Sequence, residues 1–400
     1  MKILKKLAAL AAAAAISLSA VPAVTFSANV AEPAAYGSSL TSDYIYFNSI
    51  DEAGAYVRSQ MKARTAKIMI SIPRDFNMDF QTSVNKIFAA ALKETGNGSE
   101  GDYLRYSATF FNASSDYNNY IRRIVIEFTY HTDASQEEYV SKRSSEILSS
   151  LGIDQMTSYD KIRAIYKYVA EAAVYAHNVT EDQTKGSPVF SAYGVLKNGS
   201  AVCQGYAQLL YRLLTDAGIS CRMIGGTSGK SDHVWNIAEV GGKYYLLDVT
   251  WDSQIFEQGG KELMFFMKGS DTFDKNADQP HVTSTGKEDN IVFRPDYTSQ
   301  EFRSKYPISK TDFDPSEMYS PGDVDCDGKI TAFDATLVLK AYANMSAGES
   351  SGLSKEQERS AEVSGDGKIG ATDAAYILKY YAEISGNSTI SFPDFIKTLK

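Results

Sequence analysis

The sequence has no long apolar run and no excess of cationic residues. No stretch approaches the ~20 consecutive apolar residues of a membrane-spanning helix, so we predict no membrane span. The 40 Lys and Arg residues are outnumbered by 49 Asp and Glu residues, which gives a formal net charge of −9. Phosphate groups repel an acidic chain. We therefore expect neither nucleic acid nor an anionic membrane surface as a partner.

Cysteine is also scarce. The chain has three, Cys203, Cys221 and Cys326, and three thiols cannot all pair within one chain. At least one therefore stays free, as a nucleophilic thiol must be. Cys221 follows Gly218 and opens an apolar stretch, which predicts a core thiol at the start of a buried strand.

The chain begins with the pattern of a secretory signal peptide. Lys2, Lys5 and Lys6 precede an apolar run at 7–18, and small residues follow. We predict a signal peptide over residues 1–28, cleaved after Ala23 or Ala28, and hence a secreted, extracellular protein.

Four hundred residues are too many for one ordinary core. We predict an N-terminal α/β extension at 43–150, a catalytic domain at 151–308, a linker at 309–321 and a calcium-binding domain at 322–400. In the extension, we expect strands at 66–72, 106–112 and 122–130, a turn at 114–116 and a helix at 80–94.

Three short motifs carry the chemistry of the central region. Cys203 lies in Gly199–Ala207 (GSAVCQGYA), His233 opens His-Val-Trp-Asn, and Asp248 opens Asp-Val-Thr-Trp. A thiol, an imidazole and a carboxylate in this order are the parts of a nucleophile, a base and its orienting group. A lone cysteine or histidine is more often structural, but three matching contexts rarely arise by chance. The other histidines, His131, His177 and His281, lack such a context.

The periodicity around these motifs predicts their setting. We expect helices over 135–176, broken at Gly152, and over 204–217, and strands at 234–240, 243–249 and 263–267, with a hairpin at Gly241-Gly242. Cys203 would then open a helix, whose N-terminus lowers the pKa of a thiol. His233 and Asp248 would lie on adjacent antiparallel strands.

Other polar and aromatic residues near the motifs are candidates for supporting roles. The Cys203 N–H is a candidate oxyanion donor, and a side chain of Gln204 or Tyr193 is a candidate second donor. Trp235 fits a cleft wall and core packing equally well, and Trp251 is placed in the core. For Asp252 we expect an exposed carboxylate, and the alternative is a carboxylate that supports the site residues from behind.

These motifs, with Tyr193–Ala207 and Tyr245–Asp252 around them, resemble the bacterial transglutaminase-like core over about 155–285. The resemblance implies an α+β fold with a papain-like layout, in which Cys203 is nucleophile, His233 base and Asp248 orienter. It also implies a protein or peptide amide as substrate. The motifs do not decide between hydrolysis and transamidation.

A duplicated acidic loop lies near the C-terminus. The first copy offers oxygen ligands at positions 1, 3, 5, 7 and 12 of an EF-hand-type loop with glycine at position 6, and the second copy begins 39 residues later. The predicted ligands of two structural Ca²⁺ ions are Asp323, Asp325, Asp327, the Lys329 carbonyl and Asp334, then Glu362, Ser364, Asp366, the Lys368 carbonyl and Asp373. Because Glu362 and Ser364 depart from the pattern, we expect tighter binding in the first loop.

Aspartate at position 12 and a helix after each loop resemble the type I dockerin module of cellulosomal proteins. The resemblance implies docking to a cohesin domain of a scaffoldin. The residues that it assigns to cohesin contact are Ala332, Phe333, Leu339, Lys340, Ala371, Thr372, Leu378 and Lys379.

Two other functions remain open at this point. One is a catalytically silent protein- or carbohydrate-binding component of a polysaccharide-degrading complex, although an intact triad counts against it. The other is a polysaccharide-active enzyme, but the sequence has no paired-carboxylate motif placed for glycoside hydrolysis. We expect no cofactor for catalysis, because no calcium loop lies within 155–285.

Overall fold

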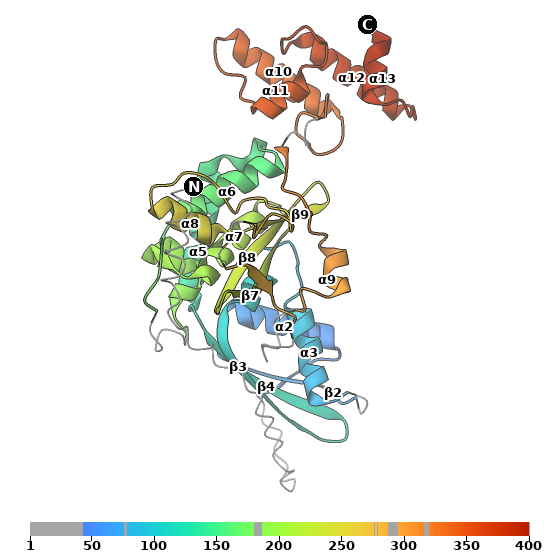
Figure 1. Ribbon diagram of the computed structural model, residues 1–400. Coiled ribbons are helices and arrows are strands. Elements are labelled where there is room, and N and C mark those ends of the chain that lie inside the picture. The colour runs from blue at the N-terminus through green and yellow to red at the C-terminus, as the bar shows by residue number, and fades with distance from the viewer. Residues whose placement is uncertain are drawn as a thin grey trace. The chain divides into compact units, whose positions relative to one another are not determined.

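The structure is a computed structural model that describes residues 43–75, 78–179, 186–275, 277, 279–286, 295–315 and 320–399 (Figure 1). The predicted signal peptide lies outside these residues. The chain divides into two compact units: residues up to 151 with Ala164–Glu239 and Tyr244–Thr311 form the first, and Gly152–Arg163, Val240–Lys243 and Asp312–Lys400 form the second. Its helices and mostly antiparallel strands confirm the α+β class.

A four-stranded sheet with helices on one face forms the N-terminal part of the first unit. The strand order is β1-β2-β4-β3. The elements are β1 (Ile45–Tyr46), α2 (Ile50–Lys62), β2 (Lys67–Pro73), α3 (Phe80–Ala91), α4 (Asp102–Arg105), β3 (Ala108–Tyr117) and β4 (Ile121–Tyr130). Alternate β4 residues, Ile124, Ile126 and Phe128, are buried in one core cluster with residues of both long helices.

Two local expectations for this part differ from the structure. Helix α2 was not predicted at all. The turn expected at 114–116 lies inside β3, and the chain reverses at 118–120 instead. There the Asn118 side chain accepts hydrogen bonds from the N–H groups of Tyr120 and Ile121, each at 2.8 Å, and so builds the turn.

The segments before Cys203 are mainly helical. They comprise α5 (Ala134–Leu151), η1 (Ile153–Gln155), α6 (Ser158–Glu171), β5 (Val174–Tyr175), η3 (Pro188–Phe190), the π-helix η4 (Gly194–Asn198) and β6 (Ser200–Ala201). Gly152 breaks the helix as predicted, with φ of 64°. The second helix was expected to reach Ala176 but ends at Glu171, because β5 pairs with β6.

Helix α7 (Cys203–Asp216) lies against the second sheet of the unit (Figure 1). This sheet has the order β10-β7-β8-β9. Its strands are β7 (Cys221–Ser228), β8 (Ser231–Val240), β9 (Lys243–Leu247) and β10 (His281–Thr283), and α8 (Val249–Glu257) and α9 (Gln300–Lys305) accompany them. Gly241 and Gly242 both have positive φ, at 63° and 78°, as a type I′ hairpin turn requires.

Two predictions at the end of this sheet were wrong. Asp248 does not lie on a strand: β9 ends at Leu247, and Asp248 is the N-cap of α8. The segment 263–267 is irregular and not a strand, and an isolated bridge between Leu246 and Lys268 follows it.

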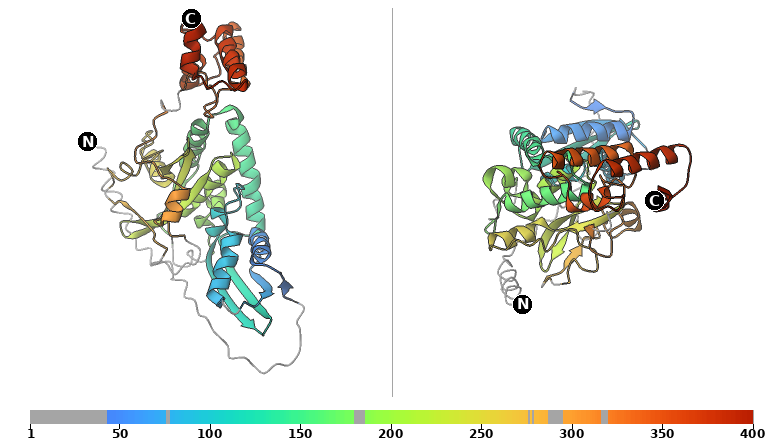
Figure 2. Two further views of the ribbon diagram at one scale, coloured as in Figure 1. Left: turned by 90° about the vertical axis from the view of Figure 1, so that its right-hand side faces the viewer. Right: turned by 90° about the horizontal axis from the view of Figure 1, so that it is seen from above.

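In the second unit, each acidic loop is followed by a long helix. Helices α10 (Ala332–Ser346) and α12 (Ala371–Ser385) pack side by side (Figure 2), with α11 (Lys355–Ala361) and α13 (Phe392–Leu399) completing the unit. Val324, Val338 and Ile377 lie in its core. Among the helices of the described residues, none has the length and apolar character to cross a bilayer.

Candidate active site

The thiol of Cys203 lies at the start of α7. Cys203 is the first residue of the helix, is 8% exposed and follows Val202, an N-cap with extended backbone and no capping side chain. The N–H groups in the first turn of a helix lack intrahelical acceptors and point out of its N-terminal end, where the Cys203 thiol lies. Gly205 is needed for this close packing, because a Cβ at this position would lie 2.8 Å from the Ser191 carbonyl oxygen.

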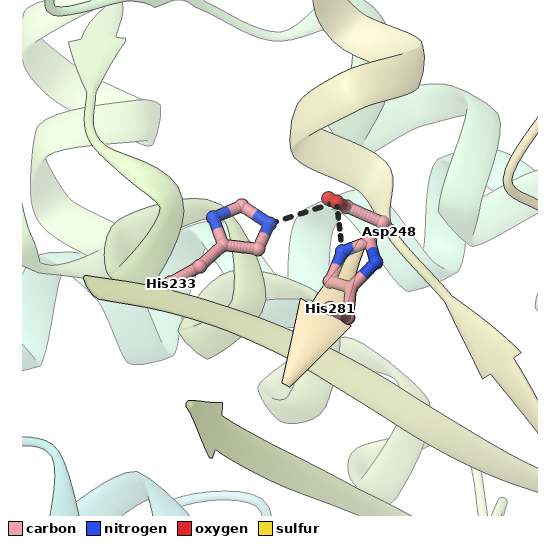
Figure 3. A group of neighbouring side chains, drawn as sticks. All are labelled: His233, Asp248 and His281. Atoms are coloured by element: carbon pink, nitrogen blue, oxygen red, sulfur yellow. Dashed lines mark hydrogen bonds and ion pairs between the residues drawn. The ribbon is translucent and has the colours of Figure 1, made fainter. Parts of the chain in front are cut away.

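His233 connects the thiol to Asp248. Its Nε2 lies 2.8 Å from Asp248 Oδ2 (Figure 3), and the Cys203 side chain lies near enough to the ring to raise its pKa. Because Nε2 faces the carboxylate, Nδ1 is the ring nitrogen left for Cys203. Burial alone would lower the pKa of His233, but the Asp248 carboxylate and the Cys203 side chain raise it to about 10. The structure therefore brings the three predicted residues together.

Four donors surround the Asp248 carboxylate, which is fully buried. As N-cap of α8, its Oδ1 accepts from the N–H groups of Thr250 at 3.0 Å and Trp251 at 3.2 Å. Its Oδ2 faces two imidazoles. Burial would raise the pKa of Asp248, but the histidines outweigh burial and hold that pKa below its ordinary value.

The second imidazole belongs to His281, which sequence reasoning left without a role. Its Nε2 lies 3.1 Å from Asp248 Oδ2 and its Nδ1 lies 2.7 Å from Asp274 Oδ1. In Figure 3, the two rings approach the carboxylate from two sides. No flanking motif marks His281, because Asp274 lies 7 residues and Asp248 33 residues before it in the chain.

Aromatic rings enclose the two histidines. Trp235 is 2% exposed, and its ring centroid lies 6.0 Å from that of His233 and 4.8 Å from that of His281. It is therefore a packing residue and not a cleft wall. Trp251, expected in the core, is partly exposed and lies 5.7 Å and 4.5 Å from the same two rings.

The two candidates for a second oxyanion donor point elsewhere. Gln204 Nε2 donates to the carbonyl oxygens of Tyr106 at 3.1 Å and Phe190 at 3.0 Å, and lies 3.2 Å from His131 Nε2. Its amide protons are thus already used, which corrects the expectation for Gln204. Tyr193 packs edge-on against Tyr139, with ring centroids 5.5 Å apart.

Asp252 is the opposite of the exposed carboxylate that was expected. It is fully buried and accepts from Tyr166 Oη at 2.6 Å and from the N–H of Met264 at 2.8 Å. Burial raises its pKa to about 7. Asp252 also accepts from the N–H of Phe265, whose carbonyl accepts from the N–H of Asp248, so it helps to hold Asp248 in place.

Tyr175 is a further residue that no sequence motif marked. Burial raises the pKa of its phenol, and the nearby Cys203 and Asp248 side chains raise it further. Its N–H donates to Glu257 at 2.8 Å, and its strand β5 pairs with β6 directly before the thiol. Tyr175 thus remains a neutral hydroxyl close to the thiol.

The first acidic loop has the features of a calcium site. One carboxylate oxygen from each of Asp323, Asp325 and Asp327 lies within 4.8 Å of the others, and Gly328 turns the loop with φ of 84°. Burial and the neighbouring carboxylates raise the pKa of Asp323 to about 7. Clustered oxygens that repel one another are suited to a hard divalent cation, so these residues fit Ca²⁺.

The second loop is arranged differently at its first position. Glu362 Oε1 accepts from the N–H groups of Gly365 at 2.6 Å and Gly367 at 3.3 Å, and from the Ser364 hydroxyl at 3.3 Å. Asp373 bonds the N–H groups of Val363 and Ser364, as Asp334 does for the corresponding residues of the first loop. The eight residues predicted to contact a cohesin are all exposed.

The group His233, Asp248 and His281 also brings three ligand-type atoms within 4.8 Å of one another. The two imidazole nitrogens are donors and the Asp248 oxygen is their common acceptor, in hydrogen bonds of 2.8 and 3.1 Å. The group is therefore a hydrogen-bonded chain, and we assign it no metal.

Comparison with known families agrees with both resemblances. Residues 149–249 match the family model of the transglutaminase-like superfamily, and residues 321–381 match that of the type I dockerin domain. The chain therefore combines a transglutaminase-like domain with a C-terminal type I dockerin domain. Type I dockerin domains bind Ca²⁺, and a dockerin implies a cohesin partner.

Curated relatives match a smaller part of the chain. Kyphoscoliosis peptidase of Homo sapiens is 25% identical over 146 residues, or 31% of this chain, and that of Mus musculus is 27% identical over 146 residues, or 33%. The match spans 22% of the length of each relative. A solved structure described as a TGase is 12% identical and covers 52% of this chain and 59% of its own, with a TM-score of 0.23.

Proposed function

We propose that this protein is a secreted, cellulosome-associated cysteine enzyme that acts on amide bonds of proteins or peptides. The observation that carries the proposal is the connected set of Cys203, His233 and Asp248 at the start of α7. One ring nitrogen of His233 faces the thiol and the other faces a buried carboxylate. This is the arrangement of a nucleophile, a general base and an orienting group.

The reaction begins with proton transfer within this set. His233 Nδ1 takes the proton of Cys203, and the raised pKa of His233 favours the resulting imidazolium–thiolate pair. The thiolate then attacks the carbonyl carbon of the amide, and the N–H of Cys203 is placed to donate to the oxyanion. The C–N bond breaks, and the leaving amine takes the proton from His233.

The product of this step is a thioester on Cys203. Water or a second amine attacks the thioester, transfers its proton to His233 and releases the acyl group, which regenerates the thiol. Attack by water gives hydrolysis or deamidation, and attack by an amine gives transamidation. Asp248 keeps Nε2 protonated and the ring in place throughout.

We further propose that the dockerin attaches this enzyme to a cohesin of a scaffoldin. Ca²⁺ bound by the loops supports folding of the dockerin and not catalysis, because the loop carboxylates lie outside the transglutaminase-like domain. The exposed Phe333, Leu339 and Leu378 supply apolar contact area on the two loop–helix repeats. Such apolar side chains fit a protein partner.

The test compares the mature chain with its Cys203→Ala variant. Both are incubated with glutamine- and asparagine-containing peptides and a labelled primary amine, and products are identified by mass spectrometry. Cys221→Ala is the matched control, because Cys221 is a buried thiol in the same unit. We expect amine incorporation, deamidation or cleavage that requires Cys203 and not Cys221. An unreactive Cys203 in a folded protein would favour the silent binding component instead.

A further inference from the structure

We propose that His281 is a positioning residue that shares Asp248 with His233, and that Asp274 keeps both of its ring nitrogens protonated. The inference rests on the proposed function for its catalytic meaning. The hydrogen-bonded chain then runs from Asp274 through His281 and Asp248 to His233, which lies beside Cys203.

The positions of the two carboxylates determine the protons on His281. Nε2 lies 3.1 Å from Asp248 Oδ2, and Nδ1 lies 2.7 Å from Asp274 Oδ1. An ionised carboxylate only accepts hydrogen bonds, so each of these contacts needs a proton on the nitrogen. A neutral imidazole has one N–H and would place a lone pair against the other carboxylate. The geometry therefore corresponds to the charged ring.

Two carboxylates and the imidazole of His233 face His281 among the described residues. The His281 side chain is 3% exposed. Asp274 approaches from the loop before β10, Asp248 from the start of α8, and His233 from β8. Trp235, Trp251 and Phe273 cover the ring with centroids 4.8, 4.5 and 4.4 Å away, and strand β7 places the uncharged Ser228 opposite it.

A charged His281 changes how Asp248 behaves at low pH. The bond and the charge of His281 both help to hold the pKa of Asp248 below its ordinary value. Asp248 therefore stays ionised as the pH falls, and it continues to orient His233 toward Cys203. Without His281, Asp248 binds a proton at a higher pH, and the imidazolium–thiolate pair is lost at that higher pH.

The test follows the pH dependence of Cys203 alkylation by iodoacetamide in the full mature chain, between pH 4 and 8. Peptide mass spectrometry reads Cys203 separately from the other two thiols. His281→Gln keeps a donor toward Asp248 but removes the charge, and Asp274→Asn removes the second carboxylate. We expect both variants to move the alkylation curve upward by about half a pH unit or more. The double variant moves it no further than His281→Gln, because Asp274 acts through His281.

Asp271→Asn is the matched control, because Asp271 is an exposed aspartate of the same loop. Imidazole ¹H–¹⁵N correlation spectra provide a second measurement, since the chain has only four histidines. We expect protons on both ring nitrogens of His281, and on only one in the Asp274→Asn variant. An unshifted alkylation curve in both variants, or a neutral His281 in the parent, overturns the proposal.

A metal in this group would also overturn it. Elemental analysis of the protein, and alkylation with and without 1,10-phenanthroline in excess Ca²⁺, test that outcome. Chelator-sensitive alkylation at Cys203 would mean that the histidines bind a transition metal. None of these measurements needs a substrate. The role of His281 can therefore fail its test while the proposed function stands, and the proposed function can fail while the role of His281 stands.

Discussion

The charge of Asp248 is the part of the site whose removal gives the sharpest prediction. Asp248→Asn keeps the shape of the side chain and an oxygen that can cap α8, because asparagine is as good an N-cap as aspartate. It removes the negative charge from a fully buried position between two imidazoles and turns one of the two acceptor oxygens into an amide NH2. Any large effect of this variant therefore reports on the loss of the carboxylate.

The size of the effect follows from the raised pKa of His233. In the folded chain this pKa is about 10, against an ordinary 6.5, and Asp248 is the main partner that raises it. Each pKa unit is worth about 1.4 kcal/mol, and breaking a buried pair costs about 3–5 kcal/mol. The single Asn oxygen can serve either the α8 cap or the imidazoles but not both, so one set of hydrogen bonds is lost together with the charge, and we expect a loss of about 3–5 kcal/mol in the free energy of unfolding at pH 6.

The sign of the pH dependence is also determined. A group whose pKa is higher in the folded than in the unfolded chain stabilises the fold fully below the unfolded value and loses this effect as pH rises through the folded value. His233 therefore makes the parent less stable as pH rises from about 6.5 to about 10. Urea unfolding at pH 6, 8 and 10 should show this decline in the parent and a flatter profile in Asp248→Asn.

The same variant should lose most of its reactivity. The rate of Cys203 alkylation at pH 6 should fall at least tenfold, and any activity found by peptide screening should fall by roughly 10²–10⁴ in kcat/KM, as for a triad that has lost its orienting carboxylate. Asp271→Asn serves again as the neutralised-charge control. Parallel stability profiles in Asp248→Asn and the parent would refute the reasoning, because they would mean that His233 does not hold an extra proton.

Three further predictions concern the surroundings of the site and the calcium loops. Gln204→Ala should lower the free energy of unfolding by about 1–3 kcal/mol with little change in Cys203 alkylation, because the Gln204 amide donates to main-chain carbonyls. A large loss of alkylation in a stable protein would instead mean that Gln204 is an active-site donor. Gly205→Ala should lower the free energy of unfolding by about 1–3 kcal/mol and slow the alkylation of Cys203, because the new Cβ would overlap the Ser191 carbonyl. An unchanged melting temperature and an unchanged alkylation rate would show that the turn can relax. By calorimetry, Asp327→Ala should remove the tighter Ca²⁺ transition and Asp366→Ala the weaker one, and the reverse assignment would contradict tighter binding in the first loop.

Sequence reasoning succeeded where a residue's neighbours in the chain are also its neighbours in space. Cys203 opens a helix because of the pattern directly after it, and Gly241-Gly242 forms the expected turn. His281 was missed because its contact with Asp248 joins residues 33 positions apart. Asp252 was placed on the surface because no short motif indicates that the chain folds back to bring Tyr166 and Met264 onto it.

The N-terminal extension, which has no chemical motif of its own, forms part of the scaffold of the thiol. Gln208 Nε2, one turn beyond Gln204 on α7, donates to the carbonyl of Tyr103 at 3.0 Å. Arg222, on β7 against α7, is paired with Asp102 through bonds of 2.7 and 3.0 Å, and both side chains are buried. Without the extension, Arg222 would be a buried charge with no carboxylate, which costs several kcal/mol. The helix that carries Cys203 is thus held from the extension as well as from its own sheet.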